Sequence, residues 1–138
     1  MKGWEHFHHE ADVGVRGFGA TPAEAFEQTA VALTATVTDP ERVDALQAVG
    51  IECAGQDLEL LLVDWLNALI SEMAVRRMLF SRFEVALDTG GLRAKAWGER
   101  ISRARHQPAV EVKGATFTEL AVGRLPDGRW RAQCVVDV

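Results

Sequence analysis

The chain has 138 residues and a mass of 15.1 kDa, which suits one compact domain around one core. Its 48% apolar and 25% charged residues are ordinary globular values, and the absence of low-complexity tracts excludes disordered and fibrous classes. The formal net charge of −5 repels phosphate, so we expect no direct, stable binding of nucleic acid. A function that touches RNA would require a protein intermediary.

The cellular setting follows from what the sequence does not contain. No apolar run is long enough for a bilayer span, and the first residues lack the apolar core of a signal peptide. We therefore expect a soluble, cytoplasmic protein with no membrane partner. Cys53 and Cys134 lie far apart without Cys-x-x-Cys spacing, so the pattern favours neither a disulfide framework nor a zinc ribbon. We expect both to be small, buried apolar residues.

The first part of the chain predicts two short strands and a helix. Alternating side chains indicate strands at residues 2–9 and 13–18, with Asp12 at the bend between them. The segment Thr21–Glu24 predicts a helix start, because a threonine cap, a proline and a glutamate follow one another at the required spacing. Apolar residues at helical spacing continue to Val37, and Asp39-Pro40 ends this helix.

A second helix and a hairpin are predicted in the middle of the chain. A short strand at residues 49–54 leads to Asp57, which is suited to the positive end of a helix. One face of that helix is apolar and carries Leu58, Leu61, Leu62, Trp65, Leu69 and Met73. From Leu79 the apolar period changes to two, and residues 89–91 (Thr-Gly-Gly) predict the turn of a hairpin.

The last third predicts further extended segments. Val110 and Val112 indicate one, and residues 125–129 predict a tight turn before a final strand. Strands, then two helices, then hairpins are typical of an α+β fold. We predict a single domain over residues 1–138, with a largely antiparallel β-sheet packed against two α-helices on one face.

The final strand suggests a metal site at its end. Its apolar side continues to the last residue through Trp130, Ala132, Cys134, Val136 and Val138. This pattern predicts that the chain end is pinned in the sheet, with its α-carboxylate held beside that of Asp137. Adjacent anions repel, and a hard divalent cation would compensate them, with Asp12 as a further oxygen ligand. The alternative is a solvated terminal aspartate without a site.

The sequence favours neither a zinc site nor a catalytic nucleophile. His6 and His8 share one side of a strand, but two histidines fall short of the four ligands of structural zinc. We expect His9 to form a hydrogen bond near the bend and His8 to be exposed. No serine or cysteine nucleophile with a base partner can be assigned, and residues 17–19 (Gly-Phe-Gly) lack the third glycine of a phosphate loop.

Several segments, in order along nearly the whole chain, resemble one known family. They are Trp4-Glu5-His6-Phe7, His9-x-Ala11-Asp12-Val13-Gly14-Val15-Arg16-Gly17-Phe18-Gly19, Glu24-Ala25-Phe26-Glu27, Asp57-Leu58-Glu59, Leu61-Leu62, Trp65-Leu66-Asn67, Ala96-x-Gly98-Glu99, His106, Glu111-Val112-Lys113-x-x-Thr116, Trp130-x-Ala132-Gln133 and Asp137-Val138. Together they resemble the archease family. Two positions depart from the family pattern: Glu10 replaces a threonine, and Phe117-Thr118 replaces Tyr-His.

The resemblance implies a small α+β protein that binds a divalent metal ion (Ca²⁺, Mg²⁺ or Mn²⁺) through Asp12, Asp137 and Val138. It also implies a role as a non-catalytic activator that promotes guanylylation and turnover of the RNA ligase of tRNA splicing or RNA repair. Lys113, in the matching Glu-Val-Lys segment, is then a candidate contact to the nucleotide or the ligase, or else a solvated strand lysine.

Two other functions remain open. One is a metal-dependent phosphoester hydrolase or phosphotransferase, with Asp12 and Asp137 as ligands and His9 as the base. The other is a chaperone or adaptor for an RNA-modifying enzyme such as a tRNA methyltransferase.

Overall fold

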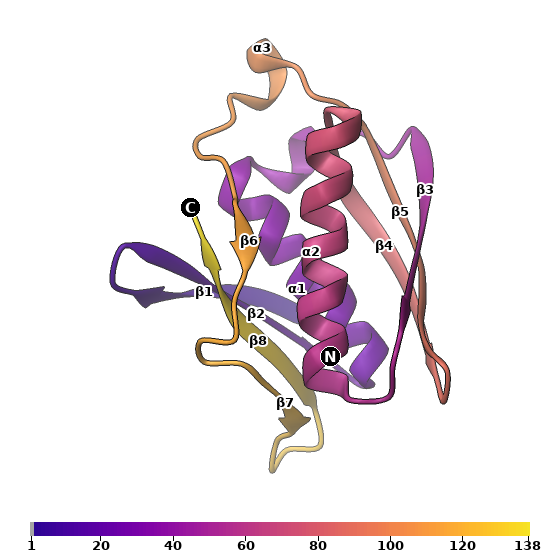
Figure 1. Cartoon of the computed structure of the whole chain (residues 1–138). Coiled ribbons are helices and arrows are strands. Elements are labelled where there is room, and N and C mark those ends of the chain that lie inside the picture. The colour runs from indigo at the N-terminus through magenta and orange to yellow at the C-terminus, as the bar shows by residue number, and fades with distance from the viewer. Residues whose placement is uncertain (1) are drawn as a thin grey trace.

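The computed structural model describes residues 2–138, which form two antiparallel sheets and two long helices that pack against both (Figure 1). The elements in chain order are β1 (Gly3–His9), β2 (Asp12–Gly19), α1 (Pro22–Val37), the 3-10 helix η1 (Pro40–Arg42), β3 (Gln47–Ala54), α2 (Leu58–Arg76), β4 (Met78–Asp88), β5 (Gly91–Arg100), α3 (Arg103–His106), β6 (Gly114–Ala115), β7 (Ala121–Arg124) and β8 (Trp130–Asp137). The first sheet has the order β1-β2-β8-β6, with β7 also paired to β8, and the second has the order β3-β5-β4.

The α+β class and the antiparallel pairing are confirmed, but the strands divide into two sheets instead of one. The burial of α1 explains the division. Its buried side chains are not confined to one stripe, since Ala25, Phe26, Thr29, Ala30, Ala32, Leu33, Thr34 and Val37 are all enclosed. A helix that is buried on several sides needs cover on more than one of them, and here each sheet covers one side.

Both predicted helix starts are confirmed. The Thr21 hydroxyl accepts the Glu24 N–H at 3.1 Å, and Glu24 Oε1 accepts the N–H of Ala20 at 2.9 Å. The reciprocal bond therefore reaches one residue further back than the usual capping box. Asp57 Oδ1 accepts the N–H groups of Glu59 and Leu60 at 2.9 and 3.1 Å, which caps α2.

Buried hydroxyls and an indole connect α1 to its neighbours. Thr29 Oγ1 donates to Ala25 O at 2.7 Å and lies 3.3 Å from Ala132 O in β8, and Thr34 Oγ1 donates to Phe80 O of β4 at 2.6 Å. Trp65 Nε1 of α2 donates to Phe26 O at 3.1 Å. Because each of these polar groups is buried, each bond also removes a desolvation penalty.

The second half of the chain follows its predictions in part. The β4–β5 hairpin and the turn at residues 125–129 are confirmed, with Gly128 at φ +91°. The extended stretch expected around Val110 and Val112 forms no strand, because its only ladder partner, β8, is reached at Gly114. The short helix α3 was not predicted.

Within residues 2–138, no helix has the length and apolarity required to cross a membrane.

Helix α1 approaches β2 closely at Gly17. A Cβ atom on Gly17 would lie 2.3 Å from Thr29 N and 2.4 Å from Ala25 O, both backbone atoms of the helix. Such atoms cannot move without shifting the helix, so only glycine permits this packing.

We expect Gly17→Ala to lower the free energy of unfolding by about 2 kcal/mol or more, since overpacked sites with rigid neighbours lie at the upper end of the observed range. Urea denaturation followed by circular dichroism measures the loss. Gly50→Ala is the matched control, because an added Cβ there meets no atom within 4 Å. Equal stabilities of the two variants would contradict the close approach.

Candidate functional site

The end of the chain is held inside the first sheet. Strand β8 pairs with β2 on one side, where Val136 lies opposite Val13, and with β6 on the other, where Asp137 lies opposite Gly114. Cys134 and Val136 are fully buried. The prediction that the final strand is pinned to its end is therefore confirmed.

Asp12 lies beside this chain end. It is the first residue of β2, after a turn in which Glu10 takes φ +52°, and its Oδ1 accepts the N–H of Val138 at 3.3 Å. The pairing of Val13 with Val136, continued by one residue, places Asp12 opposite Asp137. Opposite residues of an antiparallel pair project from the same face, so both carboxylates belong to one face of the sheet end.

Lys113 reaches the same place from a different segment. Its N–H donates to Asp137 O at 2.8 Å, and its residue is exposed. The structure thus brings together all four residues that the sequence singled out: Asp12, Lys113, Asp137 and Val138. Sequence reasoning placed Asp12, Asp137 and Val138 together, but it did not place Lys113 beside Asp137.

The donor atoms at this end are all oxygens, which suit hard cations such as Ca²⁺, Mg²⁺ or Mn²⁺. Asp12 keeps one oxygen free of the Val138 bond, and Asp137 is exposed. Among residues 2–138, no group of three or more His, Cys, Asp or Glu side chains is placed to hold a metal ion. A metal at this end would therefore need backbone oxygens or water to complete its coordination.

The histidines of β1 do not form a zinc cluster within the described part of the chain. His6 Nε2 lies 2.8 Å from Ala32 O and 3.3 Å from Thr36 Oγ1, so this ring binds the side of α1. His8 is exposed, as predicted, and His9 lies opposite Asp12 in the β1–β2 ladder.

The cysteines are poor nucleophiles. Cys134 is fully buried, and burial raises its pKa to about 12. Cys53 is half-buried and its pKa is also raised, again chiefly by burial. Both thiols are free and protonated at neutral pH, which excludes thiolate chemistry there.

A buried charge cluster around Glu99 was missed by sequence reasoning. Glu99 Oε2 accepts the Asp44 N–H at 2.8 Å and lies 3.0 Å from His106 Nε2, while Oε1 accepts from the Arg105 guanidinium at 2.7 Å. The His106 Nδ1 accepts the Ser102 N–H at 2.8 Å, so the ring proton is on Nε2 and is donated to Glu99. These bonds tie the loop after β5 to the residues after η1.

The sequence held one signal for this cluster, since Glu99 and His106 both belong to the family resemblance. Their burial could not be read from it, because Glu99 lies near the end of β5 and His106 ends the short helix α3, where no periodicity marks the interior.

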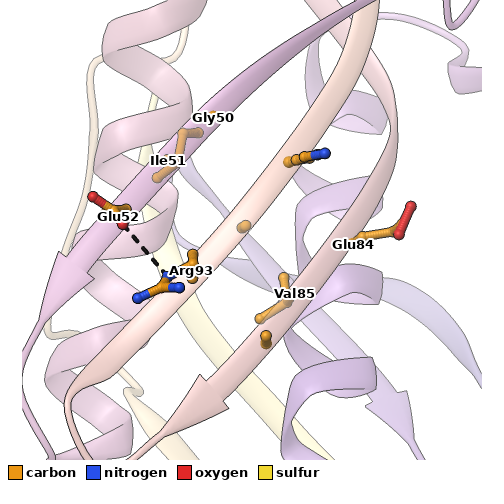
Figure 2. Close-up of a pocket in the computed structure, with 9 residues that line it drawn as sticks. Gly50, Ile51, Glu52, Glu84, Val85 and Arg93 are labelled. Carbon is orange, nitrogen blue, oxygen red and sulfur yellow. Dashed lines mark ion pairs between the residues drawn. The ribbon is translucent and has the colours of Figure 1, made fainter.

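Asp12, Asp137 and Val138 meet at one end of the first sheet, which we call the acidic end. Two hollows lie away from it. The first, of about 670 Å³, crosses strands β3, β5 and β4, where Gly50 and Ala86 leave space between charged side chains (Figure 2). An exposed ion pair between Arg93 and Glu52, at 3.4 Å, crosses its edge. The second, of about 790 Å³, lies between the C-terminal end of α2 and residues 100–112. Neither includes Asp12 or Asp137.

Comparisons with known proteins agree with the fold and with the resemblance. Residues 4–138 match the model of the Archease protein family. Two curated relatives named Protein archease, from Pyrococcus abyssi and Pyrococcus furiosus, are each 39% identical, with 100% of both chains covered. The solution structure of Methanobacterium thermoautotrophicum protein 1598 is similar, with a TM-score of 0.86, 32% identity and 99% of both chains covered.

The Glu99 cluster makes stability depend on pH. Hydrogen bonds, first from the Asp44 backbone and then from His106 and Arg105, lower the Glu99 pKa from 4.5 to about 2. A lowered pKa in the folded state adds stability that is complete above the unfolded value and is lost as the pH falls towards 2.

We therefore expect Glu99→Gln to be less stable than the parent at neutral pH and to lose less stability between pH 4.5 and 2. Urea midpoints measured across this interval test the expectation. Glu41→Gln serves as the control, because Glu41 is exposed. Parallel pH profiles for the parent and Glu99→Gln would contradict it.

Proposed function

Because this chain belongs to the archease family, we propose that it is a non-catalytic activator of an RNA ligase, promoting the ligase's guanylylation and multiple turnover in tRNA splicing or RNA repair. The observation that best supports this proposal is the meeting of Asp12, Val138, Asp137 and Lys113 at one pinned end of the first sheet. We place this activity in the cytoplasm.

The proposal includes a divalent metal ion, Ca²⁺, Mg²⁺ or Mn²⁺, at that end. The carboxylates of Asp12 and Asp137 and the backbone oxygens of Val138 are its ligands. A bound metal supplies positive charge that neutralises and aligns phosphate oxygens during nucleotidyl transfer.

The protein's own residues present this group to the ligase. Antiparallel pairing on both sides of β8 fixes the backbone of Asp137, so its carboxylate can extend from a rigid strand. Lys113 shares the backbone bond with Asp137, and its exposed ammonium group can contact a phosphate of the nucleotide or an acidic side chain of the ligase.

The hydrolase alternative is less well supported than the activator. An independent phosphoesterase encloses its substrate in a concave site, whereas the two hollows described above lie away from Asp12 and Asp137. Turnover of simple phosphoesters by the pure protein with metal would favour the enzyme. A stable complex with a tRNA methyltransferase, together with unchanged ligation, would favour the adaptor.

We expect Ca²⁺ at about a hundredfold its Kd to stabilise the parent by about 2.7 kcal/mol, because a ligand that binds only the folded state shifts the unfolding equilibrium. Asp12→Asn keeps an oxygen for the Val138 N–H, and we expect it to lose this stabilisation while remaining folded. Thermal unfolding with Ca²⁺ and with chelator provides the measurement. Asp64→Asn, an exposed change on α2, should respond to Ca²⁺ like the parent.

Ligase guanylylation with GTP, with and without the protein, tests the function itself. We expect the parent and Asp64→Asn to stimulate guanylylation and multiple-turnover ligation, and Asp12→Ala and Asp137→Asn to abolish the stimulation while retaining the circular dichroism of the parent. The proposal fails if the parent has no effect on the ligase. If Asp12→Ala stimulates the ligase as fully as the parent does, the acidic end has no part in the mechanism.

A further inference from the structure

The hollow at the C-terminal end of α2 combines an apolar floor with basic side chains. Its lining includes Ile70 and Met73 of α2, Leu79 of β4 and Val112 of the segment before β6. Exposed apolar residues, Ile101 at 37% and Val110 at 40% of their surface, extend it. Its volume of about 790 Å³ is enough for several side chains of a bound segment.

Three arginines, Arg77, Arg100 and Arg103, lie along this groove with only one acidic lining residue, Glu111. Between Lys2 and Val138, none of the three takes part in an ion pair or a side-chain hydrogen bond. In a chain of net charge −5, free cations gathered at one groove leave an uncompensated positive surface.

Arg77 has a backbone that favours a different residue. It ends α2 in the left-handed conformation, φ +54° and ψ +49°, where glycine is the usual residue. An arginine at this position has a conformational cost, and within residues 2–138 no ion pair or side-chain hydrogen bond of Arg77 offsets it.

Residues 108–112 form one wall of the groove, and hydrogen bonds hold this wall in place without a bound partner. Ala109 N–H donates to Val37 O at 2.8 Å, and Thr38 Oγ1 donates to His106 O at 2.6 Å. The buried bond between His106 and Glu99 anchors the same loop. A preformed groove loses little entropy on binding, which favours a docking role.

The composition of the lining favours a protein segment over RNA. Grooves that bind single-stranded RNA typically combine basic side chains with aromatic side chains on which the bases stack, and none of the lining residues here is aromatic. An apolar floor beside free guanidinium groups suits a segment with apolar anchors and carboxylates, because arginine binds carboxylates in a bidentate manner.

We propose that this arginine-lined groove docks an acidic, apolar segment of the RNA ligase. This inference rests on the proposed function and adds a second contact to it. Val112 lines the groove, and the next residue, Lys113, bonds Asp137 of the acidic end. In Figure 1 the chain runs from α3 to β6, which lies next to the chain end, so one short segment joins the two surfaces. Docking at the groove then sets the position of the acidic end on the ligase.

The test measures binding of the purified ligase to the full chain by calorimetry, with guanylylation assayed in parallel. Arg100→Glu/Arg103→Glu should weaken binding by roughly tenfold or more, as expected for lost charge pairs at an interface. Arg93→Glu/Lys95→Glu makes the same change in net charge on the second sheet, and we expect it to leave the Kd unchanged. Arg77→Gly should weaken binding while its thermal stability equals or exceeds that of the parent, which a merely structural arginine would not do.

Each outcome decides the proposal. Binding of Arg100→Glu/Arg103→Glu with the parent's Kd overturns the groove, and if the parent still stimulates guanylylation the proposed function stands. If the parent does not bind the ligase at all, the docking proposal is overturned as well. If Arg100→Glu/Arg103→Glu loses binding to a single-stranded RNA oligonucleotide but keeps the parent's Kd for the ligase, the groove binds RNA and the proposal is overturned. A parent that binds through the groove without stimulating the ligase supports the groove and refutes the proposed function.

Discussion

The packing of α1 against Gly17 of β2 is the constraint on which the rest of the structure depends. The absence of a side chain at Gly17 lets the helix backbone come close enough for Thr29 to reach Ala132 of β8. On its opposite side the same helix bonds β4 through Thr34. One helix therefore sets the separation of both sheets, and the core fills the remaining space.

This packing also keeps the acidic end ordered. Strand β8 is buried between β2 and β6, so its last residues keep the geometry of a strand where a chain end would ordinarily fray. The turn between β1 and β2 then places Asp12 at the N–H of Val138. The activator role that we propose needs no deep cavity here, because an exposed strand end can enter a partner's site without enclosing a substrate of its own.

Charge is distributed unevenly over this small acidic protein. Carboxylates gather where the first sheet ends, and free arginines gather at the C-terminal end of α2. The segment that carries Val112 and Lys113 connects the two. A partner that meets both surfaces is oriented by two charge patterns of opposite sign, which discriminates against wrong orientations better than either pattern alone.

Local chemistry determined what the sequence could predict. The caps at Thr21 and Asp57, the turn ending at Gly128, the bend at Asp12 and the apolar pattern that runs to Val138 all depend on neighbours within a few residues. Only the tertiary structure decided the division into two sheets, the bond from Val138 to Asp12, the burial of Glu99 with His106 and the gathering of the arginines. These features join residues that periodicity cannot relate, because the register and packing that bring them together are set by the whole core.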